Sequence, residues 1–212
     1  MPDAQCSAIQ LYYFPGTRAQ KVRWMLEELN LNYDLKLVDL RQSDHKKPDH
    51  LKRQPLGKVP VLTIDESVIY ESVGICLYLA DRFWQKMLAP VPEDHQQRAK
   101  YYTWVAFSMA TLETAVLEQH RQQKILDANN QQPATGPAFT EIDDILKHID
   151  RTLTRSPYIM GDGFSVVDIL NGAPMIWANS LGLVAGYQHI QSWLDRLQSR
   201  PAYLKSKQFT LP

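Results

Sequence analysis

The sequence predicts a mixed α/β domain of βαβ-ββα topology followed by an all-α helical domain. The first half of the 212-residue chain alternates strand and helix patterns, whereas the second half has helical periodicity and no strand signal. A proline-containing segment separates the two halves and suits a short linker. We therefore expect an α/β domain at residues 1–86, a linker at 87–94 and a helical domain at 95–212.

The first predicted unit is a strand–helix–strand segment. Residues 8–14 (AIQLYYF) predict a strand, residues 18–30 a helix, and residues 33–40 (YDLKLVDL) a second strand with alternating polarity. The apolar face of the predicted helix consists of Val22, Met25, Leu26 and Leu29. A βαβ unit of this kind has parallel strands and a right-handed crossover.

A hairpin and a further helix are expected to complete the first domain. Residues 41–54 are polar and predict a loop or a frayed helix, while 59–65 and 67–71 predict two antiparallel strands. Residues 72–83 (SVGICLYLADRF) then predict a helix, with Ser72 as a credible N-cap.

The second half is predicted to be entirely helical. Residues 95–126 carry one long helical pattern, which a kink could interrupt, and 138–155 carry another. Segments 167–183 and 190–200 predict two or three more helices. Residues 127–138 (DANNQQPATGPA) predict a polar, mobile loop.

Composition excludes several classes of protein. Lys and Arg together number 23, as do Asp and Glu, which argues against a nucleic-acid partner or a membrane surface. No apolar run approaches the ~20 residues of a membrane span, and no secretory signal is visible. Cys6 and Cys76 lie far apart, so we expect a reducing, cytoplasmic setting without a disulfide framework. No bound metal is expected.

The stretch PLGKVPVL (55–62) places Val59-Pro60 at the mouth of a predicted strand. A proline is normally excluded from a strand ladder, and a cis peptide bond here would turn the preceding N–H and C=O toward a ligand. A trans proline on an edge strand is the alternative interpretation.

Glu71 and Ser72 lie at the predicted N-terminus of a helix. Unpaired N–H groups and the positive end of the helix dipole favour a carboxylate there. The Ser72 hydroxyl and N–H could hold that carboxylate while Glu71 pairs with an ammonium, which together suit an α-amino-acid group. An ordinary N-cap beside a solvated glutamate is the alternative.

Taken together, PLGKVPVL followed by ESVGICLYLAD, after a unit that contains LEELNLNY, resembles the glutathione transferase family over essentially the whole chain. The stretch FSVVDIL strengthens the resemblance, because Ser165 and Asp168 have the spacing of a capping box. The resemblance implies an α/β thioredoxin-like N-terminal domain, an all-α C-terminal domain, glutathione as co-substrate and a homodimer.

The resemblance also implies a glutathione site along the first domain. The main chain of Val59, held by a cis Pro60, would pair with the cysteinyl part of glutathione. Glu71 and Ser72 would bind the γ-glutamyl end. His45 and Lys58 would bind the glycyl carboxylate, although a solvated loop histidine is an equal interpretation of His45.

Three candidates for thiol activation follow from the branches of the family. Tyr13 closes the first strand within a YFP stretch, and Thr17 falls where another branch has a catalytic serine. Arg18 occupies the place of the cysteine of a third branch, which excludes that mechanism, and its charge could stabilise a thiolate. The neighbouring Glu71-Ser72 favours Thr17 over Tyr13, because tyrosine-type members usually have Gln-Ser there. A core role for Tyr13 and an N-cap role for Thr17 remain open.

The second substrate is expected between the two domains, against the aromatic first turns of the long helix. Most aromatic side chains at helical spacing belong to a core. Tyr102 and Trp177 are the candidates for lining an apolar, electrophile-binding pocket.

The implied function is that of a glutathione S-transferase, a detoxification enzyme that conjugates glutathione to small apolar electrophiles or reduces organic hydroperoxides. The alternative is a non-catalytic module of the same fold that binds a ligand or a protein. A thioredoxin-like oxidoreductase is disfavoured because the chain has no C-x-x-C motif.

Overall fold

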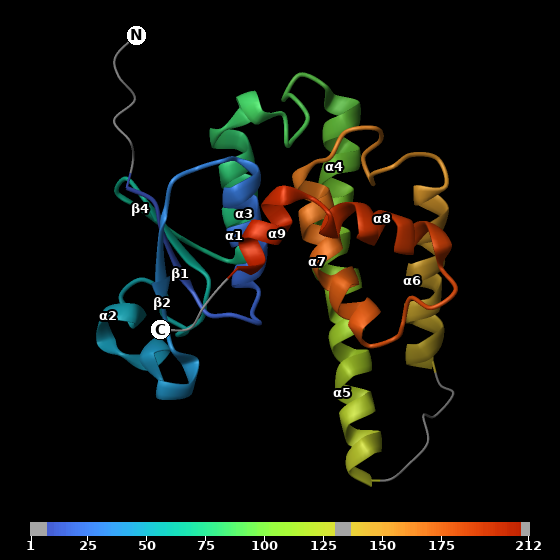
Figure 1. The fold of residues 1–212 in the computed structure, drawn as a ribbon, viewed down its shortest axis with the longest axis horizontal. Coiled ribbons are helices and arrows are strands. Elements are labelled where there is room, and N and C mark those ends of the chain that lie inside the picture. Colours follow the sequence, from blue (N-terminus) through green and yellow to red (C-terminus); the bar gives the residue numbers. More distant parts are fainter. Residues whose placement is uncertain (1–7, 130–136, 209–212) are drawn as a thin grey trace. The chain divides into compact units, whose positions relative to one another are not determined.

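The computed structural model describes residues 8–129 and 137–208 (Figure 1). The chain divides into two compact units, one of Met1–Lys86 with Arg200–Pro212 and one of Met87–Ser199. The first unit contains a sheet with helices, and the described part of the second unit is helical, as the sequence predicts.

A four-stranded mixed sheet forms the centre of the first unit, in the order β2-β1-β3-β4. The strands are β1 (Gln10–Tyr13), β2 (Asp34–Leu37), β3 (Val61–Ile64) and β4 (Ser67–Tyr70). β1 is parallel to β2 and antiparallel to β3, and β3 is antiparallel to β4. The predicted βαβ-ββα topology is therefore confirmed.

Helices cover the sheet of the first unit. They are α1 (Ala19–Glu28), α2 (Pro48–Leu51), α3 (Ser72–Arg82) and α9 (Pro201–Lys207), with short 3-10 turns at η1 (Leu40–Gln42), η2 (Asp44–Lys46) and η3 (Trp84–Lys86). The predicted apolar face of α1 is at most 1 % exposed at all four positions, which fixes this helix on the sheet. In Figure 1, α2 and the turns η1 and η2 lie on the side of the sheet away from α1 and α3.

The last helix, α9, belongs to the first unit and packs on α1. The rings of Trp24 and Tyr203 meet edge to face with centroids 4.9 Å apart, and Arg200 Nε lies 2.7 Å from a carboxylate oxygen of Glu28. The predicted helical domain of 95–212 is therefore too long at its C-terminal end. Helical periodicity marks a helix but does not identify the surface on which its apolar side packs.

The segment predicted as a linker, 87–94, lies in the second unit. The carbonyl of Leu88 accepts a hydrogen bond from the N–H of Val166 at 2.8 Å, and Leu88 is buried. Leu88 therefore anchors the start of this segment to the second unit, while residues 91–94 are exposed.

The described helices of the second unit are α4 (His95–Phe107), α5 (Glu113–Asn129), α6 (Pro137–Leu153), α7 (Val166–Ser180) and α8 (Gln188–Gln198). The long helix predicted at 95–126 is interrupted by a π turn, η4 (Ser108–Leu112). The buried hydroxyl of Ser108 donates to the carbonyl of Leu170 at 2.8 Å and ties this turn to α7. Of the loop predicted at 127–138, residues 127–129 are helical, and 130–136 lie outside the described residues.

The predicted capping box at the start of α7 is confirmed. The Asp168 carboxylate accepts hydrogen bonds from the N–H of Ser165 at 2.9 Å and from its hydroxyl at 3.1 Å. The same carboxylate accepts from Ile159 N–H at 3.0 Å and from Trp193 Nε1–H at 3.1 Å. Asp168 is completely buried, so these four bonds replace water around its charge.

Candidate functional site

The sheet brings three segments of the first unit to one end. Val61 pairs with Tyr12 on one side and with Tyr70 on the other. The residues that follow β1, precede β3 and follow β4 therefore lie at the same end of neighbouring strands. These are the segments that contain Thr17, Val59-Pro60 and Glu71-Ser72, so the fold collects the predicted site in one place.

The peptide bond between Val59 and Pro60 is cis, as the family resemblance implied. β3 starts only at Val61, and within the described residues the N–H and C=O of Val59 make no hydrogen bond. Val59 is half-buried. A main-chain donor and acceptor are thus available to an extended ligand backbone, in the manner of an added strand.

The N-terminus of α3 offers a second set of donors. The first helical hydrogen bond joins Ile75 N–H to Glu71 C=O at 2.9 Å, which leaves the N–H groups of residues 72–74 without an intrahelical acceptor. Ser72, the first helical residue, is 6 % exposed, whereas the Glu71 side chain is exposed and makes no capping bond. This end of the helix favours a carboxylate.

Glu71 has an unusual backbone conformation. Its φ of 69° and ψ of 112° lie in a region that residues other than glycine rarely adopt. Such conformations cost about 1–3 kcal/mol and occur preferentially where a ligand or a catalytic group must be held. The conformation places an exposed carboxylate directly before the open N-terminus of α3.

His45 and Lys58 come from two segments that lie against each other. A Cβ at Gly57 would lie 2.7 Å from the carbonyl oxygen of His45, and the φ of Gly57 is +62°, so only glycine permits this approach. Lys46 Nζ also donates to the carbonyl of Leu56 at 3.2 Å. His45 is half-buried and Lys58 is exposed. The side chains of His45 and Lys58 therefore extend from two segments whose main chains are in close contact.

Two further residues of this region, His50 and Gln54, were not singled out by the sequence. His50 Nε2 lies 2.9 Å from the carbonyl oxygen of Lys58, and Gln54 Oε1 accepts the N–H of Lys58 at 3.1 Å. Both side chains are at most 5 % exposed. Their only local signal is an i, i+4 spacing inside a polar segment, which is also typical of a solvated helix face.

Thr17 lies at the turn between β1 and α1, and its hydroxyl is engaged with nearby main chain. The hydroxyl donates to the carbonyl of Phe14 at 2.7 Å and accepts from the N–H of Ala19 at 3.3 Å. The side chain is half-buried, and the neighbouring Arg18 is exposed. The N-cap of α1 is Arg18, so Thr17 does not hold the N-cap position that the sequence left open, although its hydroxyl bonds to the main chain of the same turn.

Tyr13 is directed into the core beneath α1. It is 2 % exposed, and its hydroxyl donates to Gln20 Oε1 at 2.9 Å. Burial raises the pKa of this phenol, while the nearby Arg23 guanidinium, 5.7 Å from the ring centre, acts in the opposite direction. The neighbouring Tyr12 points to the other face of the sheet, where its ring meets His50.

Comparison with known proteins agrees with this arrangement. The family description "Glutathione S-transferase, N-terminal domain" matches residues 7–81, and "Glutathione S-transferase, C-terminal domain" matches residues 102–201. The chain belongs to the glutathione S-transferase family. Its sheet and helices accordingly form the thioredoxin-like domain of that family, followed by the helical domain.

Individual relatives are distant but extend over nearly the whole chain. Glutathione S-transferase hmp2 of Hypomyces subiculosus is 29% identical, with 93% of this chain and 97% of the relative covered. Disulfide-bond oxidoreductase YfcG of Escherichia coli is 28% identical, with 92% of each covered. A glutathione transferase family member from Pseudomonas fluorescens, solved with two glutathione bound, has a TM-score of 0.79 at 23% identity, covering 97% of this chain and 94% of that one.

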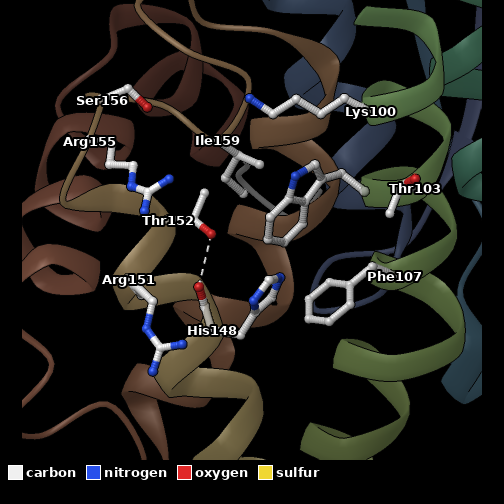
Figure 2. A pocket seen from close by; sticks show the side chains of 10 residues that line it. Lys100, Thr103, Phe107, His148, Arg151, Thr152, Arg155, Ser156 and Ile159 are labelled. Carbon is white, nitrogen blue, oxygen red and sulfur yellow. Dashed lines mark hydrogen bonds between the residues drawn. The ribbon is translucent and has the colours of Figure 1, made fainter. Parts of the chain in front are cut away.

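The second unit of this glutathione S-transferase family member contains a cavity of about 440 Å³ between α4 and α6 (Figure 2). Its lining residues are Lys100, Thr103, Trp104, Phe107, His148, Arg151, Thr152, Arg155, Ser156 and Ile159. The Trp104 and His148 rings stack with centroids 5.2 Å apart and planes 17° from parallel. The lining contains two arginines and a lysine but no carboxylate.

The two residues expected to line an electrophile pocket, Tyr102 and Trp177, do not line this cavity. Tyr102 is 57 % exposed and contacts Tyr101, whereas Trp177 is half-buried and contacts His120. The residues of α4 that do face the cavity are the neighbours of Tyr102. The cavity lies within the second unit, so the expected role of Tyr102 and Trp177 at an electrophile pocket stays a prediction.

Other chemistry finds little support among the described residues. Burial raises the pKa of the Cys76 thiol to about 12, so this side chain is not a nucleophile near neutral pH. Within residues 8–129 and 137–208, no three His, Cys, Asp or Glu side chains are grouped so as to hold a metal ion. None of the helices described is both long and apolar enough to cross a membrane.

Proposed function

We propose that this protein is a glutathione S-transferase that activates the glutathione thiol for attack on small apolar electrophiles. The observation that carries the proposal is the convergence of two open groups and one hydroxyl at one end of the sheet. The open groups are the main chain of Val59 and the N-terminus of α3 beside Glu71, and the hydroxyl is that of Thr17, which bonds to nearby main chain.

The open groups match the functional groups of a γ-glutamyl tripeptide. The N–H and C=O of Val59 pair with the cysteinyl main chain, as in strand addition. The γ-glutamyl carboxylate binds the hydroxyl and N–H of Ser72, while the adjacent ammonium pairs with Glu71. His45 and Lys58 bind the glycyl carboxylate. Each of these contacts uses a group that the fold leaves available.

Thr17 is the residue proposed to stabilise the thiolate. A thiol with a pKa of ~8.5 is mostly protonated at neutral pH, and each unit by which its pKa falls corresponds to ~1.4 kcal/mol. The Thr17 hydroxyl, which donates to Phe14 C=O, would turn its proton toward the sulfur when glutathione binds. The positive end of α1 and the charge of Arg18 add to this stabilisation. Tyr13 is disfavoured because its hydroxyl is buried against Gln20.

The same thiolate supports reduction of organic hydroperoxides. It would attack the peroxide oxygen and release an alcohol, and a second glutathione would convert the resulting sulfenate to glutathione disulfide and water. The printed name of YfcG favours one second candidate, reduction of a disulfide. There the thiolate attacks one sulfur of the substrate disulfide and displaces the other as a thiolate, and a second glutathione resolves the mixed disulfide.

A homodimer in the cytoplasm is part of the proposal. Exposed apolar side chains on the first unit support an association surface, among them Val68 and Tyr70 on the edge strand β4, which are 49 % and 44 % exposed. The mass in solution, measured by light scattering, should be twice the chain mass of 24.4 kDa. A reducing compartment suits a chain that keeps Cys76 as a free thiol.

The test uses glutathione, a chromogenic aryl halide, cumene hydroperoxide and a small organic disulfide as substrates. Thr17→Ala should lower kcat/KM roughly 10²-fold, because it removes a hydrogen-bond donor to developing negative charge. Thr17→Ser should retain most of the activity, and Tyr13→Phe should retain it as well. Loss of activity in Tyr13→Phe alone would reverse the assignment of the two hydroxyls.

Binding supplies the wider test. Wild-type protein that neither binds immobilised glutathione nor turns over any of the three substrates would contradict the proposed function and favour the non-catalytic alternative. The ratio of the three activities decides between conjugation, hydroperoxide reduction and disulfide reduction.

A further inference from the structure

The buried side chains of His50 and Gln54 both form hydrogen bonds with the main chain of one residue, Lys58. His50 is 5 % exposed and Gln54 is 1 % exposed. The first contacts the C=O of Lys58 at 2.9 Å, and the second accepts the N–H of Lys58 at 3.1 Å. Because the N–H and the C=O of one residue belong to different peptide planes, both planes that flank the Lys58 Cα are fixed.

The contact fixes the role of one ring nitrogen of His50. A carbonyl oxygen only accepts, so Nε2 carries a proton and donates it to the C=O of Lys58. Nδ1 is buried and has no hydrogen-bond partner among the described residues. Buried polar atoms are usually paired, so a ring that leaves one nitrogen unpaired is not the arrangement that stability alone would favour. The side chain of Lys58 is exposed, and water could otherwise serve its main chain.

The direction of the Val59 N–H follows from the same contact. The C=O of Lys58 and the N–H of Val59 share one trans peptide plane and point in opposite directions. Anchoring the C=O on His50 therefore turns the Val59 N–H away from α2. The Val59 N–H is also one of the groups that the described part of the chain leaves without an acceptor.

We propose that His50 and Gln54 are positioning residues for the glutathione site, which set the Val59 main chain and the Lys58 side chain in the orientation that binds the tripeptide. This inference rests on the proposed function. Neither residue touches the ligand: they act through the two peptide planes of Lys58. Tyr12 supports the arrangement from the sheet, because its ring lies edge to face with His50 at a centroid distance of 6.3 Å.

The test compares variants that remove each contact with variants that restore it. His50→Phe keeps a ring but has no donor, and His50→Gln restores an N–H donor. Gln54→Met removes the acceptor, and Gln54→Glu keeps one. Lys52→Met is the matched control, since Lys52 lies between the two residues and its exposed side chain pairs only with Asp49 at the surface.

The expected result is a selective loss of glutathione affinity. His50→Phe and Gln54→Met should each raise the glutathione KM and the calorimetric Kd about tenfold, the scale of one lost positioning hydrogen bond. The KM for the electrophile and kcat should change less than threefold. His50→Gln, Gln54→Glu and Lys52→Met should stay within threefold of wild type.

A readout without catalysis separates positioning from simple stability. Hydrogen exchange of the Lys58 N–H should accelerate in Gln54→Met and remain slow in Gln54→Glu. Folded His50→Phe and Gln54→Met proteins that bind glutathione with wild-type affinity would overturn the inference and leave the proposed function intact. Equal loss in the contact-removing and contact-restoring variants would also overturn it. Wild-type protein that fails to bind glutathione would overturn both.

Discussion

The N-termini of α3 and α7 each have a carboxylate beside them, yet the two helix ends are built in opposite ways. At α7, the buried Asp168 turns back and accepts four hydrogen bonds, two of them from Ser165. At α3, the exposed Glu71 caps nothing and holds a backbone conformation with φ of 69°. One end is closed by its own side chains, and the other is open.

The polar groups at the N-terminus of α7 stabilise the fold, whereas those at the N-terminus of α3 are available to a ligand. All donors around Asp168 come from the second unit itself, so its charge needs no further partner. Around Glu71, the N–H groups of residues 72–74 and the main chain of Val59 are left over. Unsatisfied groups at the surface are stable in water, and a ligand can replace that water with little reorganisation. The predictions below use this contrast.

The largest effect is expected at the closed end. Asp168→Ala removes four buried hydrogen bonds and leaves their donors unpaired, which should lower the free energy of unfolding by about 3–5 kcal/mol. Urea denaturation followed by circular dichroism measures it. Asp162→Ala is the control, because Asp162 is an exposed aspartate of the same segment and should change stability by less than ~0.5 kcal/mol. If Asp168→Ala lowered the free energy of unfolding by less than ~1 kcal/mol, the four hydrogen bonds of Asp168 would not be important for the fold.

An intermediate effect is expected at Glu28, a carboxylate that is paired but caps no helix. Arg200 holds it with two contacts of 2.7 and 2.8 Å, and the Glu28 side chain is 7% exposed. Arg200→Met should destabilise the protein by about 2 kcal/mol, because a largely buried charge loses its partner while Arg200 itself is partly solvated. Arg200→Lys should recover part of the loss. Full stability in Arg200→Met would show that the other contacts of α9, among them Lys205 with Glu27 and Gln20 with Ser206, hold this helix without the ion pair.

The two serines beside the helix ends give a matched pair. Ser165→Ala, at the closed end, should cost about 1 kcal/mol of unfolding free energy and leave glutathione affinity unchanged. Ser72→Ala, at the open end, should change stability by less than ~0.5 kcal/mol and weaken glutathione binding about tenfold. Thermal melts and titration calorimetry on both variants measure the four values. The contrast fails if the two serines behave alike.

The effect expected at Glu71 is a gain of stability rather than a loss. Glu71→Gly relieves about 1–3 kcal/mol of backbone strain, and the greater entropy of the unfolded chain offsets about 0.5–1 kcal/mol of that gain. The free energy of unfolding should therefore rise by up to about 2.5 kcal/mol, and glutathione binding should weaken. Glu71→Gln keeps the strained backbone, so its melting temperature should match wild type while its glutathione KM rises. Equal melting temperatures for Glu71→Gly and Glu71→Gln would show that the backbone of Glu71 is not strained.

Much of the candidate site could be predicted because its signals are local. Pro60 at a strand entrance, Ser72 at a helix start and the hydroxyl of Thr17 after a Pro-Gly turn are each defined by a few neighbouring residues. The Ser165–Asp168 spacing identified the closed helix end for the same reason. The sequence analysis did not identify His50 and Gln54. Their proposed role depends on contacts with Lys58, which form only when the polar segment folds back.

The sequence by itself determined the order of strands and helices and the capping box, since these depend on periodicity and side-chain chemistry over a few residues, whereas it left both isomers of the Val59-Pro60 bond open until the family resemblance implied the cis form. Only the tertiary structure decided that α9 packs on α1, that a π turn divides the long helix, and that Tyr13 is buried while Thr17 stays accessible. It also decided that Trp104 and Phe107 of α4 line a cavity with His148 of α6. These features depend on contacts between residues far apart in the chain, which no local pattern encodes.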